Sequence, residues 1–350
     1  MNYYIAETYF GVTEQFTAGS KARRDVEHIL SAMGYVEIKK NSNKEPMFTS
    51  LISHFRKYVD WKKCLEEIGY NDNLVIQFPV EEHTIFMENV IKKLTKKGVN
   101  VILFIHDLQY IRFATNKDFP LKRKIRLKME EISCLKAANK IIAHNAQMRD
   151  YLINLGIEPL KIIVLKIFDY LIPNYSPRII SNNEHALIVA GNLNKNKAGY
   201  LYKIDNSIAL NLYGIGYEVQ ERQNIHYYGT YLPDELPKHL VGKFGLVWDG
   251  DNAESCTGSY GEYLKLNNPH KASLYLAAGI PVVIWDKAAL SDFVNEEKCG
   301  ICIDSLKTSN NILSKISDEK YSEMKENALR VGKLMRKGYF LETAIKAAMR

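Results

Sequence analysis

Short apolar runs alternate with amphipathic segments along most of the chain. In the first half, the apolar runs have the length of buried strands, and the segments between them have the 3.6-residue spacing of helices; these runs lie at 3–10, 36–39, 74–78, 99–106 and 140–144. The second half repeats the alternation, with strand-like runs at 185–190, 208–213, 225–228, 245–248, 280–285 and 301–303. Such alternation predicts an α/β fold with parallel strands and crossover helices.

One stretch interrupts this pattern. Residues 171–184 hold two prolines, three asparagines and two serines, with few periodic apolar positions, as expected of a linker. We therefore predict two α/β domains, 1–170 and 185–337, with a cleft between them. A chain of 350 residues suits two domains of about 150 residues each.

Composition and charge narrow the classes of function. No apolar run approaches the roughly 20 residues of a membrane helix, the first residues lack the pattern of a signal peptide, and the five scattered cysteines suit a reducing compartment. We therefore expect a cytoplasmic protein. The net charge of +7 favours anionic partners. Phosphorylated small molecules and an anionic membrane fit better than nucleic acid, because no nucleic-acid-binding motif is present.

The most informative local signal is the sequence NNPHK at 267–271. Asn268 is a favourable N-cap and Pro269 suits the first helical position, so we predict a helix that begins here and runs to 278. A strand follows at once. Ligands of parallel α/β sheets bind at the carboxyl ends of strands. We therefore expect this helix start, with the positive end of its dipole and Lys271, to bind a pyrophosphate.

Two loops occupy similar positions. The turn before the first helix, in which Ser20 can cap the helix, offers free backbone N–H groups to a phosphate or substrate; it includes Thr17, Gly19, Ser20 and Lys21. The loop after the first strand of the second half could contact a nucleotide, and it includes Gly191, Asn192 and Lys195. An ordinary capped turn and a hydrophilic turn, respectively, remain the alternatives.

A candidate general base follows the most apolar strand of the first half. His106 and Asp107 stand at its carboxyl end, where a carboxylate or an imidazole could accept a proton from an acceptor hydroxyl. The alternative for Asp107 is a cap on the next segment.

Three further patterns have weaker functional interpretations. Asp249-Gly250-Asp251 matches a D-x-D motif that binds a metal ion in some enzymes, and Glu254 with Glu262 has an E-x₇-E spacing found in others. We expect neither a metal site nor a shared role for the two glutamates. The basic stretch 117–128, from Lys117 to Lys128, predicts an amphipathic helix whose cationic outer face is solvated or touches anionic lipid or an acidic acceptor; its apolar face comprises Leu121, Ile125, Met129 and Ile132.

On these motifs the chain resembles the bacterial glucosyltransferase family that extends N-acetylglucosamine on serine-rich repeat adhesins, and the related β-1,6-galactofuranosyltransferases. The resemblance covers nearly the whole chain. Its most specific block is NNPHK at 267–271 with GIPV at 279–282, and the supporting matches are GSKA at 19–22, IHD at 105–107, AGNL at 190–193 and LVWDG at 246–250.

This resemblance implies a GT-B fold, in which two Rossmann-like domains face a central cleft with the acceptor on the first and the donor on the second. It implies a UDP-sugar donor, no other cofactor, no essential metal, a homo-oligomer (dimer or tetramer), and a C-terminal helix, 338–350, that packs back on the first domain. The loop from Thr17 to Lys21 would close over donor and acceptor. Donor-site residues would be Gly191, Asn192, Lys195, Tyr213, Asp249, Asn267, Asn268, His270 and Lys271.

The first hypothesis for function is therefore transfer of a hexose, with glucose expected, from a UDP-sugar to a hydroxyl of a glycan or glycoprotein such as N-acetylglucosamine on an adhesin. His106 or Asp107 would be the base. The alternatives are galactofuranosyl transfer to a surface polysaccharide, nucleotide-sugar epimerisation, and a non-catalytic sugar-binding partner of another transferase.

Overall fold

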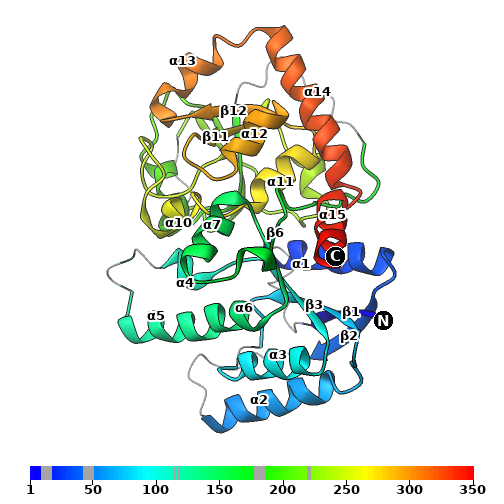
Figure 1. Ribbon diagram of the computed structural model, residues 1–350. Helices are drawn as coiled ribbons and strands as arrows, with labels where there is room; N and C mark the ends of the chain where they lie inside the picture. Colours follow the sequence, from blue (N-terminus) through cyan, green and yellow to red (C-terminus); the bar gives the residue numbers. More distant parts are fainter. Residues whose placement is uncertain are drawn as a thin grey trace. The chain divides into compact units, whose positions relative to one another are not determined.

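The computed structural model describes residues 1–8, 18–41, 51–82, 84–113, 116, 119–176, 186–218 and 222–350 (Figure 1). The chain divides into two compact units. Unit 1 consists of Met1–Glu14, Arg23–Leu165 and Leu341–Arg350, and unit 2 consists of Gln15–Ala22 and Lys166–Phe340. Each unit contains one parallel sheet, which confirms the predicted α/β class.

The sheet of unit 1 has the strand order β2-β1-β3-β4-β5-β6, and every neighbouring pair is parallel. Its strands are β1 (Asn2–Thr8), β2 (Val36–Asn41), β3 (Asn73–Phe78), β4 (Asn100–Ile105), β5 (Lys140–Ala143) and β6 (Ile162–Val164). The two central strands β3 and β4 are buried except at their first residues, as expected for strands covered on both faces. The order reverses between β1 and β3, and such switch points are where ligands bind in these sheets.

The helices of unit 1 cover this sheet (Figure 1). They are α2 (Leu51–Cys64), α3 (Met87–Lys96), α4 (Gln109–Arg112), α5 (Leu121–Leu127), α6 (Ser133–Ala137), α7 (Ala146–Asn154) and most of α1 (Ala18–Ala32). Helix α3 packs against β4 and α6, and it buries Met87, Val90, Ile91 and Leu94. It ends before Gly98, whose φ of +85° supplies the left-handed turn that stops the helix. A π-helical turn over Lys128–Ile132 joins α5 to α6.

The sheet of unit 2 has the order β12-β11-β10-β7-β8-β9, again with only parallel pairs. Its strands are β7 (Leu187–Asn192), β8 (Leu210–Ile215), β9 (Ile225–Tyr227), β10 (Phe244–Val247), β11 (Val282–Trp285) and β12 (Gly300–Ile303). Numbered from β7, this is the 3-2-1-4-5-6 order of a Rossmann fold, and its switch point lies between β7 and β10.

Helix α11 (His270–Ala277) is the central helix of unit 2, packed against β10, β11 and α14. Gly245 on β10 makes this packing possible, because a Cβ at that position would lie 2.2 Å from the ring of Tyr275. The other helices are α8 (Lys195–Ala198), α9 (Leu236–His239), α10 (Gly258–Tyr263), α12 (Ser291–Glu297), α13 (Ser309–Leu313), α14 (Asp318–Met335) and the start of α15 (Tyr339–Ala348).

One strand, β6 (Ile162–Val164), was not predicted. Gly338, with φ +74°, separates α14 from α15. Residues 177–185, which include part of the predicted linker, lie outside the described residues. No helix among the described residues has the length and apolar character needed to span a bilayer.

Candidate functional site

The start of α11 lies beyond the carboxyl ends of the strands of unit 2, as predicted, but its cap differs from the prediction. Pro269, with φ −70° and ψ 127°, occupies the N-cap position and makes no side-chain capping bond. Asn268 is not the cap, because its Nδ2 donates to the carbonyl oxygen of Lys166 at 2.9 Å. The first backbone N–H groups of α11 therefore donate no hydrogen bond to the side chain of the N-cap residue, Pro269.

Lys271 and Asp249 form an ion pair at this helix start. Lys271 Nζ lies 2.8 Å from Asp249 Oδ1 and donates to the carbonyl oxygen of Trp248 at 3.0 Å. Both side chains are largely buried, with 11% of Lys271 and 6% of Asp249 exposed. Burial lowers the pKa of Lys271, and the charge of Asp249 opposes that shift. The anion expected opposite this lysine is thus supplied by the chain itself.

His270 stands beside this pair in an aromatic setting. Its ring packs 5.1 Å from Tyr170 and 5.9 Å from Phe168, measured between ring centroids. Its Nε2 is buried and accepts or donates no hydrogen bond within the described part of the chain. Burial, helped by the nearby charge of Lys21, lowers the pKa of His270 to about 3, so the ring is neutral at physiological pH. A buried ring nitrogen without a partner is available to a ligand.

Lys21 completes this cluster in unit 2. Its Nζ lies 2.7 Å from Asp234 Oδ1, donates to the carbonyl oxygen of Leu171 at 2.7 Å, and sits 4.8 Å from the ring centroid of Tyr170. Because α1 already begins at Ala18, Ser20 lies in its first turn and is not the predicted cap. Thr17 lies outside the described residues.

The predicted donor loop follows β7, with Gly191 and Asn192 exposed at the strand end. Gly191 (φ +127°) faces Gly214 of β8 (φ +135°), where a Cβ would lie 1.8 Å from the carbonyl oxygen of Gly191. Asn192 Oδ1 accepts from the backbone N–H of Asn194 at 3.0 Å. Lys195 is exposed and pairs with Glu218, outside the cluster around His270.

Tyr213 lies in the core of unit 2, fully buried. Its hydroxyl accepts from the backbone N–H of Val241 at 2.9 Å, and its ring stacks on Tyr228 with centroids 4.8 Å apart. Tyr213 therefore supports the position of Tyr228, which is half-buried just after β9, and is not itself exposed to a ligand.

The acidic patterns do not converge. Asp249 binds Lys271, whereas Asp251 Oδ1 accepts from the hydroxyl of Thr257 at 2.6 Å. Glu254 pairs with Lys307 and Glu262 with Lys265, all exposed. Within the described ranges, no group of three or more His, Cys, Asp or Glu residues is placed to hold a metal ion. Asn267 Oδ1, next to the helix start, is buried and makes no hydrogen bond to a described residue.

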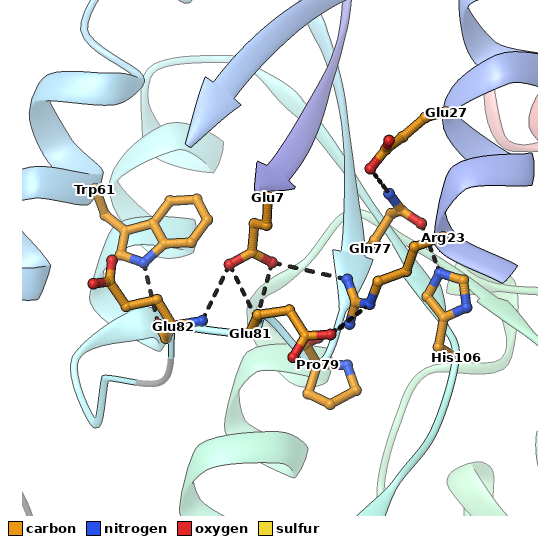
Figure 2. A network of polar contacts seen from close by, with 9 residues as sticks. All are labelled: Glu7, Arg23, Glu27, Trp61, Gln77, Pro79, Glu81, Glu82 and His106. Atoms are coloured by element: carbon orange, nitrogen blue, oxygen red, sulfur yellow. Dashed lines mark hydrogen bonds and ion pairs between the residues drawn. The ribbon is translucent and has the colours of Figure 1, made fainter. Parts of the chain in front are cut away.

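A second polar network lies at the switch point of unit 1 (Figure 2). Glu7, near the end of β1, accepts from the backbone N–H groups of Glu81 at 2.9 Å and Glu82 at 3.1 Å, just after β3. Arg23 reaches the same spot, with Nε 2.7 Å from Glu81 Oε1 and Nη1 3.8 Å from Glu7 Oε2. These contacts tie the ends of β1 and β3 together.

His106 belongs to this network through Gln77. His106 Nε2 lies 2.7 Å from Gln77 Oε1, and Gln77 Nε2 donates to Glu27 Oε1 at 3.0 Å. Because an amide oxygen only accepts, Nε2 of His106 carries the proton and Nδ1 is the basic nitrogen. Burial raises the pKa of Glu27 to about 7. The arrangement gives a histidine of fixed tautomer at the carboxyl end of β4.

Asp107 has a different setting, although it is adjacent. Its Oδ1 accepts from the backbone N–H of Leu108 at 2.8 Å, and its Oδ2 forms an ion pair with Arg112 of α4. The side chain keeps 30% of its surface exposed. Asp107 does not cap α4, because Leu108 occupies the N-cap position and the backbone N–H groups of Gln109 and Tyr110 donate to the carboxylate of Glu131. The partial exposure of Asp107 leaves it accessible for an acceptor-side role.

The sequence-based reasoning missed Arg23, Glu27, Gln77 and Glu81. One signal could have found Gln77: it is the single polar side chain within the apolar run 74–78. A polar side chain inside a buried strand requires hydrogen-bond partners, and those partners come from other elements.

Family models and relatives agree with this architecture. Residues 2–167 match the glucosyltransferase 3-like N-terminal domain, and residues 187–348 match the glucosyltransferase 3-like C-terminal domain. The chain is 31% identical over 332 residues to the β-1,6-galactofuranosyltransferase WbbI of Escherichia coli K12, covering 94% of this chain and 93% of WbbI. It is 27% identical over 334 residues to glucosyltransferase 3 of Streptococcus gordonii, covering 95% of this chain and 93% of that protein.

Solved structures show the same fold. WaaG, a glycosyltransferase involved in lipopolysaccharide biosynthesis, superposes with a TM-score of 0.61 at 16% identity, over 99% of this chain and 98% of WaaG. Anabaena HepE, solved with UDP and glucose, gives a TM-score of 0.54 at 13% identity, over 99% of this chain and 98% of HepE. The expected GT-B fold is confirmed. The chain is a GT-B glycosyltransferase of the glucosyltransferase 3-like family.

Proposed function

We propose that the protein transfers a hexose from a UDP-sugar to a hydroxyl of a glycan or glycosylated protein. The observation that carries the donor part is the start of α11, where His270 and Lys21 both contact the ring of Tyr170 and Lys271 follows in the first turn. A helix N-terminus with a lysine in its first turn suits the diphosphate of a nucleotide-sugar. The neutral His270, whose Nε2 has no partner among the described residues, suits a sugar hydroxyl or a phosphate oxygen.

The proposal includes a metal-independent mechanism. In the free enzyme Lys271 is held by Asp249. When the diphosphate binds, Lys271 Nζ shifts or shares its protons between the carboxylate and a phosphate oxygen, so that cationic side chains and the helix dipole offset the charge of the leaving UDP. Asn267, with its buried and unbonded Oδ1, is proposed to accept from the donor.

On the acceptor side, we propose His106 as the base, with Asp107 as the alternative. The Nε2–H of His106 donates to Gln77 Oε1. Nδ1 is therefore the nitrogen that can take a proton from the acceptor hydroxyl. Asp107 would first have to weaken its pair with Arg112.

The donor assignment is tested with purified protein and a panel of nucleotide-sugars. UDP and one UDP-hexose should raise the melting temperature equally in Mg²⁺ and in EDTA, and GDP- and CMP-sugars should not. A ligand at 100 times its dissociation constant adds about 2.7 kcal/mol to the unfolding free energy. Stabilisation by GDP- or CMP-sugars alone would reject the UDP-sugar donor, and loss of stabilisation in EDTA would reject the metal-free mechanism.

Galactofuranosyl transfer is the second candidate, favoured by the 31% identity to WbbI. The two candidates separate when UDP-glucose and UDP-galactofuranose are offered with an N-acetylglucosamine-bearing peptide and with an oligosaccharide that has free primary hydroxyls. Release of UDP that requires acceptor identifies the pair used. Turnover by the pure protein would also exclude a non-catalytic partner role.

A further inference from the structure

Three of the four side chains on the apolar face of the predicted basic helix are exposed in α5 and the turn that follows it. Leu121, Ile125 and Met129 are 72%, 52% and 65% exposed. They follow one another at intervals of four residues along α5 and the π-helical turn, so they form one stripe on the helix surface, which we call the α5 stripe. The helix is instead anchored to unit 1 through Leu127 and Ile132, which are 7% and 3% exposed.

The α5 stripe is surrounded by positive charge. Residues 121–130 contain five basic side chains and one acidic one, Glu130, which is already paired with Arg126 at 2.8 Å. Lys122 and Lys128 are exposed, and neither pairs with an acid in the described part of the chain. The guanidinium of Arg123 lies 5.2 Å from the ring centroid of Phe119, which adds an aromatic group at the start of the helix.

This combination differs from ordinary exposed side chains. A single exposed leucine, such as Leu160 at 80%, is common on protein surfaces. Three apolar side chains in line, bordered by cations, are the pattern of a helix that lies in a membrane interface. A second copy of the chain fits poorly, because it would bring two strongly cationic helices together. An anionic bilayer satisfies both the apolar and the cationic groups.

We propose that α5 docks unit 1 on an anionic membrane surface, with the α5 stripe inserted at the boundary between headgroups and acyl chains. The basic side chains that border the stripe lie at headgroup level. The inference is independent of the donor and acceptor assignments, since none of its residues belongs to either candidate site. Docking of α5 would hold the enzyme at the membrane surface, where lipid-linked or membrane-proximal acceptors are found.

The test uses the full chain and vesicles that sediment on centrifugation, made either of phosphatidylcholine alone or of phosphatidylcholine with about one third phosphatidylglycerol. We expect binding to the anionic vesicles and little to the neutral ones. Each cation near an anionic leaflet contributes about fivefold to the partition coefficient. Binding should also fall steeply as salt rises from about 0.1 to about 1 M, where the Debye length shrinks from roughly 10 to 3 Å.

Two variants isolate the contributions. The first replaces the α5 stripe with serines (Leu121→Ser, Ile125→Ser, Met129→Ser), and its matched control is Leu160→Ser. Losing each apolar side chain should weaken partitioning about tenfold. The second variant, Lys122→Gln with Lys128→Gln, should weaken it about 25-fold. Its control is Lys39→Gln with Lys93→Gln, exposed lysines elsewhere on unit 1.

The proposal is supported if the two α5 variants lose anionic vesicle binding while both controls keep it. Unchanged melting temperatures and UDP-sugar binding in these variants would show that they are folded, as expected for exposed positions. Equal binding to neutral vesicles, or none to either kind, would overturn it. Binding that survives in the α5 variants but is lost when the exposed apolar residues of α2 become serines (Leu51, Ile52 and Phe55) would also overturn it. Dissociation of an oligomer by the stripe variant, without any vesicle binding, would identify the stripe as a contact between copies and overturn it too.

Discussion

Removing the charge of Lys271 tests the ion pair at the start of α11. In Lys271→Met, the carboxylate of Asp249 would keep 6% exposure and lose the Nζ partner 2.8 Å away. Removing one member of a buried pair typically costs about 3–5 kcal/mol, because the remaining charge is left without its partner. For a unit of this size, 1 kcal/mol corresponds to roughly 2–4 °C, so the melting temperature of unit 2 should fall by about 6–20 °C.

This expectation reverses one that follows from the helix dipole alone. A lysine in the first turn of a helix is unfavourable by itself, so its removal would leave stability unchanged or raise it. The structure supplies the missing anion in Asp249, which gives the opposite sign. In the double variant Lys271→Met with Asp249→Asn, no buried charge remains, and most of the lost stability should return.

The assay is a double-mutant cycle by urea and thermal unfolding, with Asp249→Asn as the second single variant. Calorimetric titration of the same proteins with UDP and with uridine measures the effect of each substitution on ligand affinity. A lost diphosphate contact of about 1.5–3 kcal/mol would weaken the affinity for UDP about 10- to 150-fold and leave the affinity for uridine unchanged. Two findings would refute the reasoning: a coupling energy near zero, which would mean that the pair does not form, or equal losses for UDP and uridine, which would mean that Lys271 only supports the fold.

Three further predictions concern other parts of the chain. His106→Gln should lower turnover about 100- to 10,000-fold with UDP affinity unchanged; if Asp107→Asn does so instead, Asp107 is the base, and normal turnover in both would remove the acceptor-side assignment. The pKa of Glu27 is raised from 4.5 to about 7 in the native state. The unfolding free energy should therefore fall as pH rises from about 4.5 to about 7, and the urea midpoints of Glu27→Gln should not show that fall. The same pH dependence in wild type and variant would contradict this assignment to Glu27. Gly245→Ala should cost about 1–3 kcal/mol by thermal unfolding, because its Cβ would lie 2.2 Å from the ring of Tyr275, whereas Gly69→Ala, with its nearest atom at 3.8 Å, is the mild control. Equal effects of the two glycine substitutions would show that the ring of Tyr275 moves away from a Cβ at residue 245 without a cost in stability.

Much of the fold could be predicted from local pattern. The runs 74–78 and 99–106 were identified as buried strands because their apolar residues are contiguous and turn signals bound them, and β3 and β4 occupy these positions. The helix after Pro269 was predicted for the same kind of local reason.

The polar partners in the candidate sites could not be predicted, because they depend on which elements become neighbours. Lys271 and Asp249 are 22 residues apart, and the sequence presented Asp249 as part of a D-x-D motif. Gln77 lies 29 residues from His106 and 50 from Glu27. The sequence showed that a cation at a helix start and an amide in a buried strand both require polar partners. Only the folded topology shows which residues are those partners.

The division of the chain into units has a consequence for engineering by domain exchange. Unit 1 ends with Leu341–Arg350, and unit 2 begins with Gln15–Ala22, so neither unit is one continuous segment of sequence. The family domain that covers 187–348 therefore does not coincide with a structural unit. A chimera spliced once near residue 166 would combine a first unit from one parent with that unit's last helix from the other. Exchanging one whole unit with a relative therefore requires joints at all four crossings of the chain, with both short segments kept with the unit in which they fold.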